Sequence, residues 1–201
     1  MAQPTLLIAD DHRSLADAMS RRLAEWYAVL APVTTLGFLG EALDLAHPDV
    51  VLLDLDFGTE SSVGMIPDLV ARYPATRFVV FTGLTAPVLV DACLMGGAHG
   101  FVSKLADPEE IHQAIDAALA GGVPVVRPVR DAPRPARRAA RPPRNEVDAR
   151  KEAILWMLRS GFTHREIAER VGVSQKTVEY HVARTRKKKG SAGPPFPTEP
   201  S

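Results

Sequence analysis

Five polar side chains have the types that together bind a divalent cation and a phosphoryl group. Asp10 and Asp11 follow a short apolar run near the amino terminus, Asp54 follows another, and Thr82 and Lys104 close two later ones. Carboxylates that converge without partners repel one another, so the set needs a hard divalent cation with oxygen ligands, and we predict Mg²⁺. The hydroxyl and the ammonium would then hold an anionic group on one aspartate. The pattern therefore indicates a phosphorylatable carboxylate.

Each member of this set also has an ordinary structural explanation when it is taken alone. Asp11 could cap the helix that follows it, Asp54 could be a polar residue at a strand end, and Lys104 could be a surface lysine. The hypothesis of a shared site therefore depends on the elements that bring these residues to one place.

Residues 1–122 alternate short apolar strands with amphipathic helical stretches. Five such units predict an α/β fold with a five-stranded parallel sheet, doubly wound and flavodoxin-like, with helices on both faces. In such sheets the carboxyl ends of the strands meet in one crevice, where the five polar side chains would gather. The predicted strands are Thr5–Ala9, Tyr27–Val33, Val50–Leu53, Phe78–Phe81 and Gly100–Val102, and the predicted helices lie near 14–25, 38–46, 62–72, 87–95 and 108–121.

The formal net charge of zero conceals a strong asymmetry along the chain. Residues 1–125 hold 6 Lys+Arg against 16 Asp+Glu, whereas the remaining residues hold 18 against 8. An acidic part suits cations or phosphorylated partners that arrive with a metal, and a basic part suits a polyanion such as DNA. The opposite charges also motivate the hypothesis that electrostatic attraction holds the two parts together in a resting state.

A segment rich in proline and arginine separates the acidic part from the basic one. Residues 124–144 contain six prolines and seven arginines, a composition that predicts an extended, semi-rigid linker. We therefore expect a first domain at residues 1–122, a linker at 123–145, a second domain at 146–190 and a disordered tail at 191–201.

Composition also bounds the compartment. The single cysteine, Cys93, cannot form an internal disulfide. No apolar run approaches the roughly 20 residues that span a bilayer, and no basic region precedes the apolar stretch near the amino terminus. We expect a cytoplasmic protein without a membrane partner.

Residues 3–122 resemble a response-regulator receiver domain. The matching motifs are Asp10-Asp11, Val50–Asp54, Phe81-Thr82-Gly83 and Gly100–Lys104. The resemblance implies that Asp54 accepts a phosphoryl group from a sensor histidine kinase. It further implies that Mg²⁺ is held by Asp10, Asp11, Asp54 and the backbone carbonyl of Asp56, that Lys104 and Thr82 bind phosphoryl oxygens, and that the rotamer of Phe101 follows Thr82.

Three features depart from the usual receiver pattern. The run from Asp54 to Gly64 is about two residues longer than usual, and Asp56 and Glu60 add negative charge within it. Leu105 follows Lys104 where a proline is expected, which removes the usual reason for a cis peptide. These departures keep open an alternative, an atypical receiver controlled by a ligand or a protein partner without phosphorylation.

The basic part carries the pattern of a helix-turn-helix. Residues 146–159 predict an amphipathic helix with Ile154, Leu155 and Leu158 on one face. Thr163 and Glu166 have the spacing of a capping box at the start of a second helix. Ser174 is placed to cap a third helix, the recognition helix, which runs from Gln175 to about Lys188 with Val178 and Val182 on its buried face.

This part resembles the DNA-binding domain of LuxR-type regulators in the runs Gly161–Ala168 and Lys176–His181. The resemblance puts Glu179, Tyr180 and Ala183 at base-reading positions. The full set of predicted DNA-binding residues is Gln175, Lys176, Thr177, Glu179, Tyr180, Ala183, Arg184 and Lys187. Four prolines in residues 190–201 predict that no fourth, dimerising helix follows. A homodimer would then form through the receiver.

The combined resemblance is to the NarL/FixJ response regulators, which predicts a DNA-binding transcriptional regulator and not an enzyme. The implied partners are double-stranded DNA, a sensor histidine kinase and, as a further candidate, RNA polymerase. A competing interpretation is an Asp-nucleophile phosphatase, because Asp54-Leu55-Asp56 has the Asp-x-Asp form of the haloacid-dehalogenase type. That motif would be expected on the first strand and here follows the third, and a phosphatase leaves residues 146–190 unexplained.

Overall fold

The computed structural model describes residues 2–58, 60–84, 87–126 and 151–188, the last range with gaps at 152, 156, 159–161 and 172. The backbone alone is described for residues 88, 170, 181 and 183–188. The predicted linker, apart from residues 123–126, and the predicted tail lie outside these ranges. None of the helices in the described ranges combines the length and the apolar character needed to cross a membrane.

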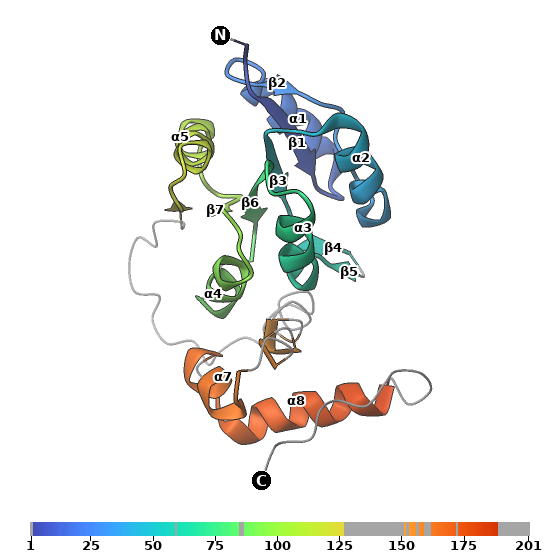
Figure 1. The fold of residues 1–201 in the computed structure, drawn as a ribbon, viewed down its shortest axis with the longest axis vertical. Coiled ribbons are helices and arrows are strands. Elements are labelled where there is room, and N and C mark those ends of the chain that lie inside the picture. The colour runs from blue at the N-terminus through green and yellow to red at the C-terminus, as the bar shows by residue number, and fades with distance from the viewer. Residues whose placement is uncertain are drawn as a thin grey trace.

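A parallel sheet forms the centre of the amino-terminal part and confirms the predicted α/β class (Figure 1). The strand order is β2-β1-β3-β6-β7-β8. Side chains along a strand alternate between the two faces, so Leu6 and Ile8 join one apolar cluster while Leu7 and Ala9 join the other. The strands are β1 (Thr5–Ala9), β2 (Ala28–Val29), β3 (Val50–Leu53), β6 (Arg77–Thr82), β7 (Gly100–Ser103) and β8 (Val125–Val126).

Helices cover both faces of this sheet. Buried residues of α1 (Arg13–Leu23) and α5 (Pro108–Leu119) belong to one apolar cluster, and the two helices contact each other. The opposite face is covered by α2 (Leu39–Ala46), α3 (Ile66–Arg72) and α4 (Pro87–Met95), with short 3₁₀ turns at Leu36–Phe38 and Val63–Met65.

The sheet differs from the prediction in two strands. The expected strand Tyr27–Val33 is reduced to Ala28–Val29 and a single bridge between Ala9 and Val33. Pro32 lacks an amide hydrogen, which explains why a regular ladder does not continue through it. The sixth strand, β8, was not predicted and lies inside the segment assigned to the linker; it pairs with β7 in the register Phe101↔Val125.

The long run after Asp54 forms a small antiparallel hairpin, β4 (Asp56–Phe57) and β5 (Glu60–Ser61). The sequence pattern predicted a reshaped loop but no hairpin. Gly58 begins the turn with a positive φ of 66°, a conformation that glycine adopts without strain. The two additional residues therefore build an ordered projection beside the carboxyl end of β3.

Two helices, α5 and α7 (His164–Val171), begin with capping boxes. In α5, the Asp107 side chain accepts from the Glu110 amide and the Glu110 side chain accepts from the Asp107 amide. The predicted capping box of α7 is confirmed: the Thr163 amide donates to Glu166 Oε2 at 2.9 Å, and the Glu166 amide donates to Thr163 Oγ1 at 3.3 Å.

The carboxyl-terminal part is a helix-turn-helix built from α7 and α8 (Gln175–Lys188). The predicted cap of α8 is confirmed, because Ser174 Oγ accepts from the Thr177 amide at 3.2 Å. Ile167 and Val178 are fully buried between the two helices and their neighbours. The preceding helical stretch turns a slightly different face inward than predicted: the buried residues are Ala153, Ile154 and Met157, whereas Leu155 and Leu158 are half-buried.

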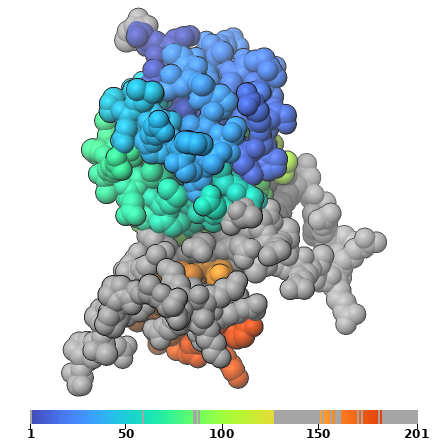
Figure 2. All heavy atoms as spheres, turned by 90° about the vertical axis from the view of Figure 1, so that its right-hand side faces the viewer, coloured from blue at the N-terminus to red at the C-terminus, as the bar shows by residue number. Residues whose placement is uncertain are grey.

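An apolar contact joins the two parts of the molecule. Helix α4 contacts α7, and the buried residues of both belong to one continuous apolar cluster. Figure 1 shows α7 between α4 and α8, and Figure 2 shows the described residues of α7 and α8, orange to red, at the end opposite the amino-terminal strand. The described contact between α4 and α7 is therefore apolar, and the predicted electrostatic attraction between the two parts stays a hypothesis.

Candidate functional site

The polar residues singled out in the sequence lie at one edge of the sheet. Asp10 and Asp11 come directly after β1, Asp54 after β3 and Lys104 after β7, and Thr82 is the last residue of β6. The four strands run parallel, so these ends share one edge. Asp10, Asp54 and Thr82 are almost completely buried, with exposed fractions of 1%, 2% and 0%.

The ammonium of Lys104 bridges two of the carboxylates. Its Nζ lies 2.6 Å from Asp10 Oδ2 and 2.6 Å from Asp54 Oδ2. The described residues contain no cis peptide bond, so the bond between Lys104 and Leu105 is trans. This is expected where no proline follows the lysine. The lysine is aimed by other means: its amide donates to the Thr82 carbonyl at 3.0 Å, which fixes the loop after β7 against β6.

The two residues that flank the hairpin, Leu55 and Ser62, also hold Asp54 in place. Asp54 Oδ1 accepts from the Leu55 amide at 2.7 Å, and the Asp54 carbonyl accepts from Ser62 Oγ at 2.5 Å. Ser62 is fully buried. A Cβ added at Gly58 would lie 3.5 Å from Asp11 Oδ2, so the turn of the hairpin passes close to the second carboxylate. Sequence reasoning did not find Ser62, because no pattern near it predicts a hydrogen bond to the carbonyl of a residue eight positions earlier.

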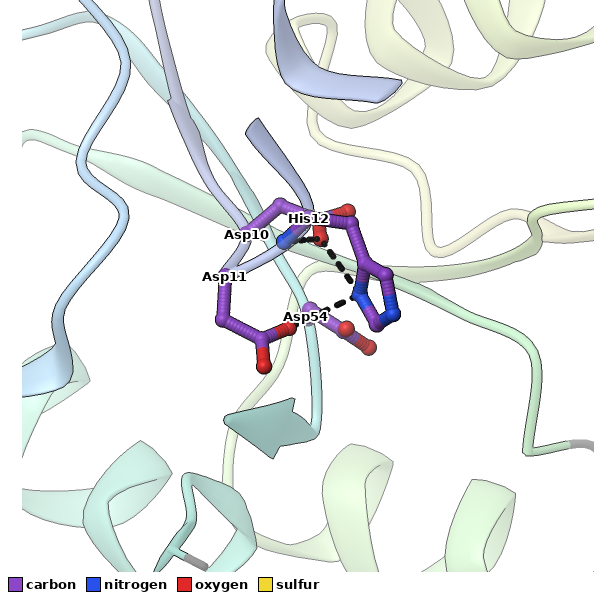
Figure 3. Close-up of side chains that lie close together, drawn as sticks. All are labelled: Asp10, Asp11, His12 and Asp54. Atoms are coloured by element: carbon purple, nitrogen blue, oxygen red, sulfur yellow. Dashed lines mark hydrogen bonds and ion pairs between the residues drawn. The ribbon is translucent and has the colours of Figure 1, made fainter. Parts of the chain in front are cut away.

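His12 is a further member of the cluster that sequence reasoning did not single out. Its Nδ1 lies 2.8 Å from Asp11 Oδ1 and 3.4 Å from Asp10 Oδ1. One atom each from Asp10, Asp11, His12 and Asp54 lies within 4.8 Å of all the others. Figure 3 shows the imidazole edge turned toward the carboxylates. Its adjacency to Asp11 was the available signal.

The pocket shifts the titration of two groups, Asp54 and Lys104. Burial raises the pKa of Asp54 above its usual value, and the neighbouring Asp10 carboxylate adds to this, while Lys104 and the Thr82 hydroxyl act in the opposite direction. Burial by itself lowers the pKa of Lys104, but Asp54 and Asp10 together raise it above the usual value. Lys104 therefore stays charged, and the ionised form of Asp54 is disfavoured by its surroundings.

Two oxygen atoms in the pocket are suited to a metal ion. Asp10 Oδ2 and Asp11 Oδ1 are both buried; the first lies 2.6 Å from Lys104 Nζ and the second 2.8 Å from His12 Nδ1. Carboxylate oxygens are the ligands that Mg²⁺ prefers, and buried oxygens with unused acceptor capacity are costly unless a cation or donor occupies the space between them. The donor set thus fits the hard divalent cation that the sequence implied.

The remaining predicted residues of the receiver take distinct places. Thr82 Oγ1 accepts from the Leu84 amide at 3.2 Å. Phe101 is fully buried on the α4 side of the sheet, and its amide donates to the Pro124 carbonyl at 2.8 Å. Asp56 lies on β4, within the hairpin, and its side chain is half-buried.

The predicted DNA-reading residues lie along α8. Gln175, Lys176, Glu179 and Tyr180 are exposed, Tyr180 to 57%. Thr177 is half-buried, and its hydroxyl lies 2.8 Å from Ser174 Oγ at the helix start, so it forms part of the cap. Gln175 Nε2 donates to Glu179 Oε1 at 3.4 Å. The side chains of Ala183, Arg184 and Lys187 lie outside the described set.

Comparison with known families matches both parts of the chain. The pattern of the response regulator receiver domain matches residues 6–116, which contain every member of the acidic pocket. The pattern of sigma-70 region 4 matches residues 148–188, which contain α7 and α8.

Individual proteins resemble the chain over most of its length. It is 31% identical over 191 residues to the methanol utilization control regulatory protein MoxX of Paracoccus denitrificans, covering 86% of this chain and 79% of that protein. A LuxR-family two-component response regulator from Aurantimonas sp. SI85-9A1 is 26% identical and superposes with a TM-score of 0.57 over 61% of this chain and 89% of its own. RcsB of Salmonella typhimurium, at 19% identity, shares the fold over 96% of this chain and 95% of its own with a TM-score of 0.55. The chain therefore belongs to the response regulators and joins a receiver domain to a LuxR-type helix-turn-helix region.

Proposed function

We propose that this protein is a transcriptional response regulator in which phosphorylation of Asp54 by a sensor histidine kinase controls the binding of double-stranded DNA. The observation that carries the proposal is the position of Asp54, 2% exposed, 2.6 Å from Lys104 Nζ and beside Asp10 and Asp11. A buried carboxylate next to a lysine and two further carboxylates is suited to accept and hold a dianionic group when a cation balances the charge.

Phosphoryl transfer to this site needs positioning and charge balance. A carboxylate oxygen of Asp54 attacks the phosphorus of a phosphohistidine; the bond between phosphorus and the histidine nitrogen breaks, and the nitrogen keeps the electron pair. Asp10, Asp11, Asp54 and the backbone carbonyl of Asp56 would hold Mg²⁺, which when bound neutralises charge on the phosphoryl oxygens. The Lys104 ammonium and the Thr82 hydroxyl are close enough to the carboxylate to bind those oxygens.

The signal would leave the site through the elements that carry these groups. The acyl phosphate would attract the Thr82 hydroxyl, at the end of β6, and the Lys104 ammonium, just after β7. Strand β7 carries Phe101, which packs on the α4 side of the sheet and whose amide donates to the carbonyl of Pro124, within the first residues of the linker. Helix α4 in turn contacts α7. This chain of contacts supports a switch that reaches the helix-turn-helix.

The output would be sequence recognition by α8. Helix α8 places Glu179 and Tyr180 on an exposed face, as base reading in the major groove requires, with Gln175 and Lys176 at its amino end. Arg184 and Lys187 would contact phosphates, and Ala183 a base edge. Such a protein acts by binding DNA in the cytoplasm, with RNA polymerase as a further candidate partner, and not by turning over a substrate.

We further propose the division of the chain into a receiver at residues 1–122, a linker at 123–145, a DNA-binding domain at 146–190 and a tail at 191–201. The family matches at 6–116 and 148–188 support it, while the pairing of β8 with β7 ties the first residues of the linker to the receiver sheet. A homodimer would form through the receiver.

The test is DNA binding by the full chain with and without a small phosphoryl donor. The probe is a duplex selected by this protein from a random-sequence library, in the presence of Mg²⁺. We expect acetyl phosphate to raise the affinity of the wild type and to leave Asp54→Ala unchanged. An equal response of both proteins would contradict the proposal.

The hairpin favours a second candidate, a receiver controlled by a ligand or a protein partner without phosphorylation. Its strands bring Asp56 and Glu60, two further acidic residues, to the side of the pocket from which the Gly58 turn approaches Asp11. Added negative charge opposes the approach of a dianion. Identical DNA binding by wild type and Asp54→Ala under every donor tested would favour this candidate.

A further inference from the structure

We propose that the edge strand β8 is the coupling element that carries the phosphorylation signal from the receiver sheet into the linker. The inference rests on the proposed function and deepens it, because it names the route by which phosphorylation of Asp54 would change DNA binding. The receiver match ends at residue 116, before β8, and the sequence analysis assigned this strand to the linker.

Three adjacent strands carry the groups that would bind the phosphoryl oxygens and the start of the linker. Strands β6, β7 and β8 are neighbours in the sheet. Thr82 ends β6, Lys104 follows β7, and the chain continues into the linker directly from Val126 at the end of β8. Val102, two positions before Lys104, pairs with Val126. The path from Lys104 to the linker is therefore one short stretch of strand and one pairing between strands.

Gly100 makes the pairing of β8 with β7 possible. A Cβ added at Gly100 would lie 3.1 Å from Pro124 Cγ and 3.3 Å from the Pro124 carbonyl oxygen. The first distance is shorter than the roughly 3.5 Å at which two carbon atoms attract each other most strongly. The same Pro124 carbonyl accepts from the Phe101 amide at 2.8 Å. A side chain at position 100 would therefore push away the residue that accepts this hydrogen bond.

The attachment of β8 is weak enough for a switch. The strand has two residues, of which Val126 packs against the apolar cluster shared by α1 and α5, while Val125 is 40% exposed. Among the described strands only β7 pairs with it. A segment with few buried apolar contacts has a low free energy of local opening. A shift of β7 on phosphorylation therefore changes how β8 is held.

The composition of the linker suits this role. Residues 124–144 contain six prolines and seven arginines, which predicts a semi-rigid segment that passes on a displacement of its first residues. The route also differs from the contact between α4 and α7. Val126 packs against the cluster of α1 and α5, whereas the buried residues of α4 and α7 belong to the other cluster. Detaching β8 should therefore leave the α4–α7 contact in place.

The experiment measures binding of the selected duplex by the full chain, with Mg²⁺ and with or without acetyl phosphate. Gly100→Ala acts from β7, and Val126→Pro removes a backbone amide from β8. We expect the donor to raise the affinity of the wild type by roughly fivefold or more, the size of an ordinary allosteric coupling. In both variants we expect no gain, although intact mass shows the same added phosphoryl group as in the wild type.

Gly40→Ala is the matched control, because nothing lies within 4 Å of a Cβ added at that position on α2. It should gain affinity as the wild type does. Hydrogen exchange of the Phe101 amide reports whether β8 is detached: we expect slow exchange in the wild type and Gly40→Ala, and fast exchange in Gly100→Ala and Val126→Pro.

Three results would overturn the inference while leaving the proposed function intact. They are a gain of wild-type size in a variant whose Phe101 amide exchanges fast, slow exchange of that amide in both variants, and loss of phosphorylation in both variants. A wild type whose DNA affinity does not respond to acetyl phosphate would overturn the proposed function as well.

Discussion

At the scale of single residues, the pocket is defined by one partly buried ammonium between two buried carboxylates. Lys104 is 14% exposed and contacts Asp10 and Asp54 at 2.6 Å each. A buried pair contributes little net stability, but removing one partner leaves an uncompensated charge in a poorly solvated place. Lys104, which would bind the phosphoryl group, therefore also balances the negative charge of Asp10 and Asp54 before phosphorylation.

Lys104→Ala should lower the free energy of unfolding by about 3 kcal/mol in urea titrations with a chelator present. Arg72→Ala is the control: its guanidinium lies 2.7 Å from Asp44, but the pair is 65% and 52% exposed, so about 0.5 kcal/mol or less is expected. Equal effects of the two substitutions would show that burial of Lys104 does not matter.

Asp54→Asn should stabilise the metal-free fold at neutral pH. The folded state raises the pKa of Asp54 from its usual 3.8, chiefly through burial, so folding favours the protonated form. The loss of folding stability caused by ionised Asp54 is absent below pH 3.8 and develops as the pH rises through the pKa of Asp54 in the folded state. We expect Tm to rise by about 4 °C at neutral pH, with the gain disappearing as the solution is acidified. A gain that grew on acidification would contradict this sign.

The residue types alone identified most of this pocket. Asp10, Asp11, Asp54 and Lys104 were found because each follows an apolar strand, and parallel strands put those positions on one edge. His12 and Ser62 were not found. Their roles depend on the side-chain direction at a helix start and on the path of a loop, which short sequence patterns do not encode.

At the scale of elements, the hairpin β4–β5 distinguishes this receiver. Ser62 closes it onto the Asp54 carbonyl, and Gly58 brings its turn to Asp11. The sequence showed the extra length of this loop but not its conformation. The strands are only two residues long, and the one residue that indicates the turn is Gly58, whose φ is positive. The alternation of strands and helices, by contrast, predicted the sheet correctly except at Pro32 and β8.

Glu60→Gln should accelerate phosphorylation by acetyl phosphate about threefold at low salt. The substitution keeps the shape of an exposed side chain and removes one negative charge beside a site that a dianion must approach. Rates would be followed by phosphoprotein gel mobility. Glu25→Gln, also at an exposed position but beyond the carboxyl end of α1, should leave the rate unchanged. A faster Glu25→Gln would mean that only net charge matters.

At the scale of the whole molecule, the acidic and basic parts meet through apolar side chains. The described residues of α4 include Leu89, Val90, Ala92 and Cys93, all buried, in the same cluster as residues of α7 and α8. The opposite net charges pointed to attraction between the parts, but charge counts do not say which faces touch. The sequence showed that α4 is apolar, but it did not show that α4 contacts α7 as well as the sheet.

The contact between the parts should therefore resist salt. Exposed charges are screened within about 8 Å at physiological ionic strength, whereas apolar contacts are not weakened by salt. Small-angle scattering of the unphosphorylated chain should give the same maximum dimension at low and high NaCl, while DNA affinity falls steeply over that range. An expansion of the molecule at high NaCl would show that electrostatic attraction holds the parts together.

The most direct measurement is the intact mass of the full chain after incubation with acetyl phosphate and Mg²⁺, for the wild type, Asp54→Asn and Asp56→Asn. We predict one added phosphoryl group on the wild type and on Asp56→Asn, and none on Asp54→Asn. A wild type that gains no mass, or an Asp54→Asn variant that gains the same mass as the wild type, would contradict the assignment of Asp54 as the phosphoacceptor.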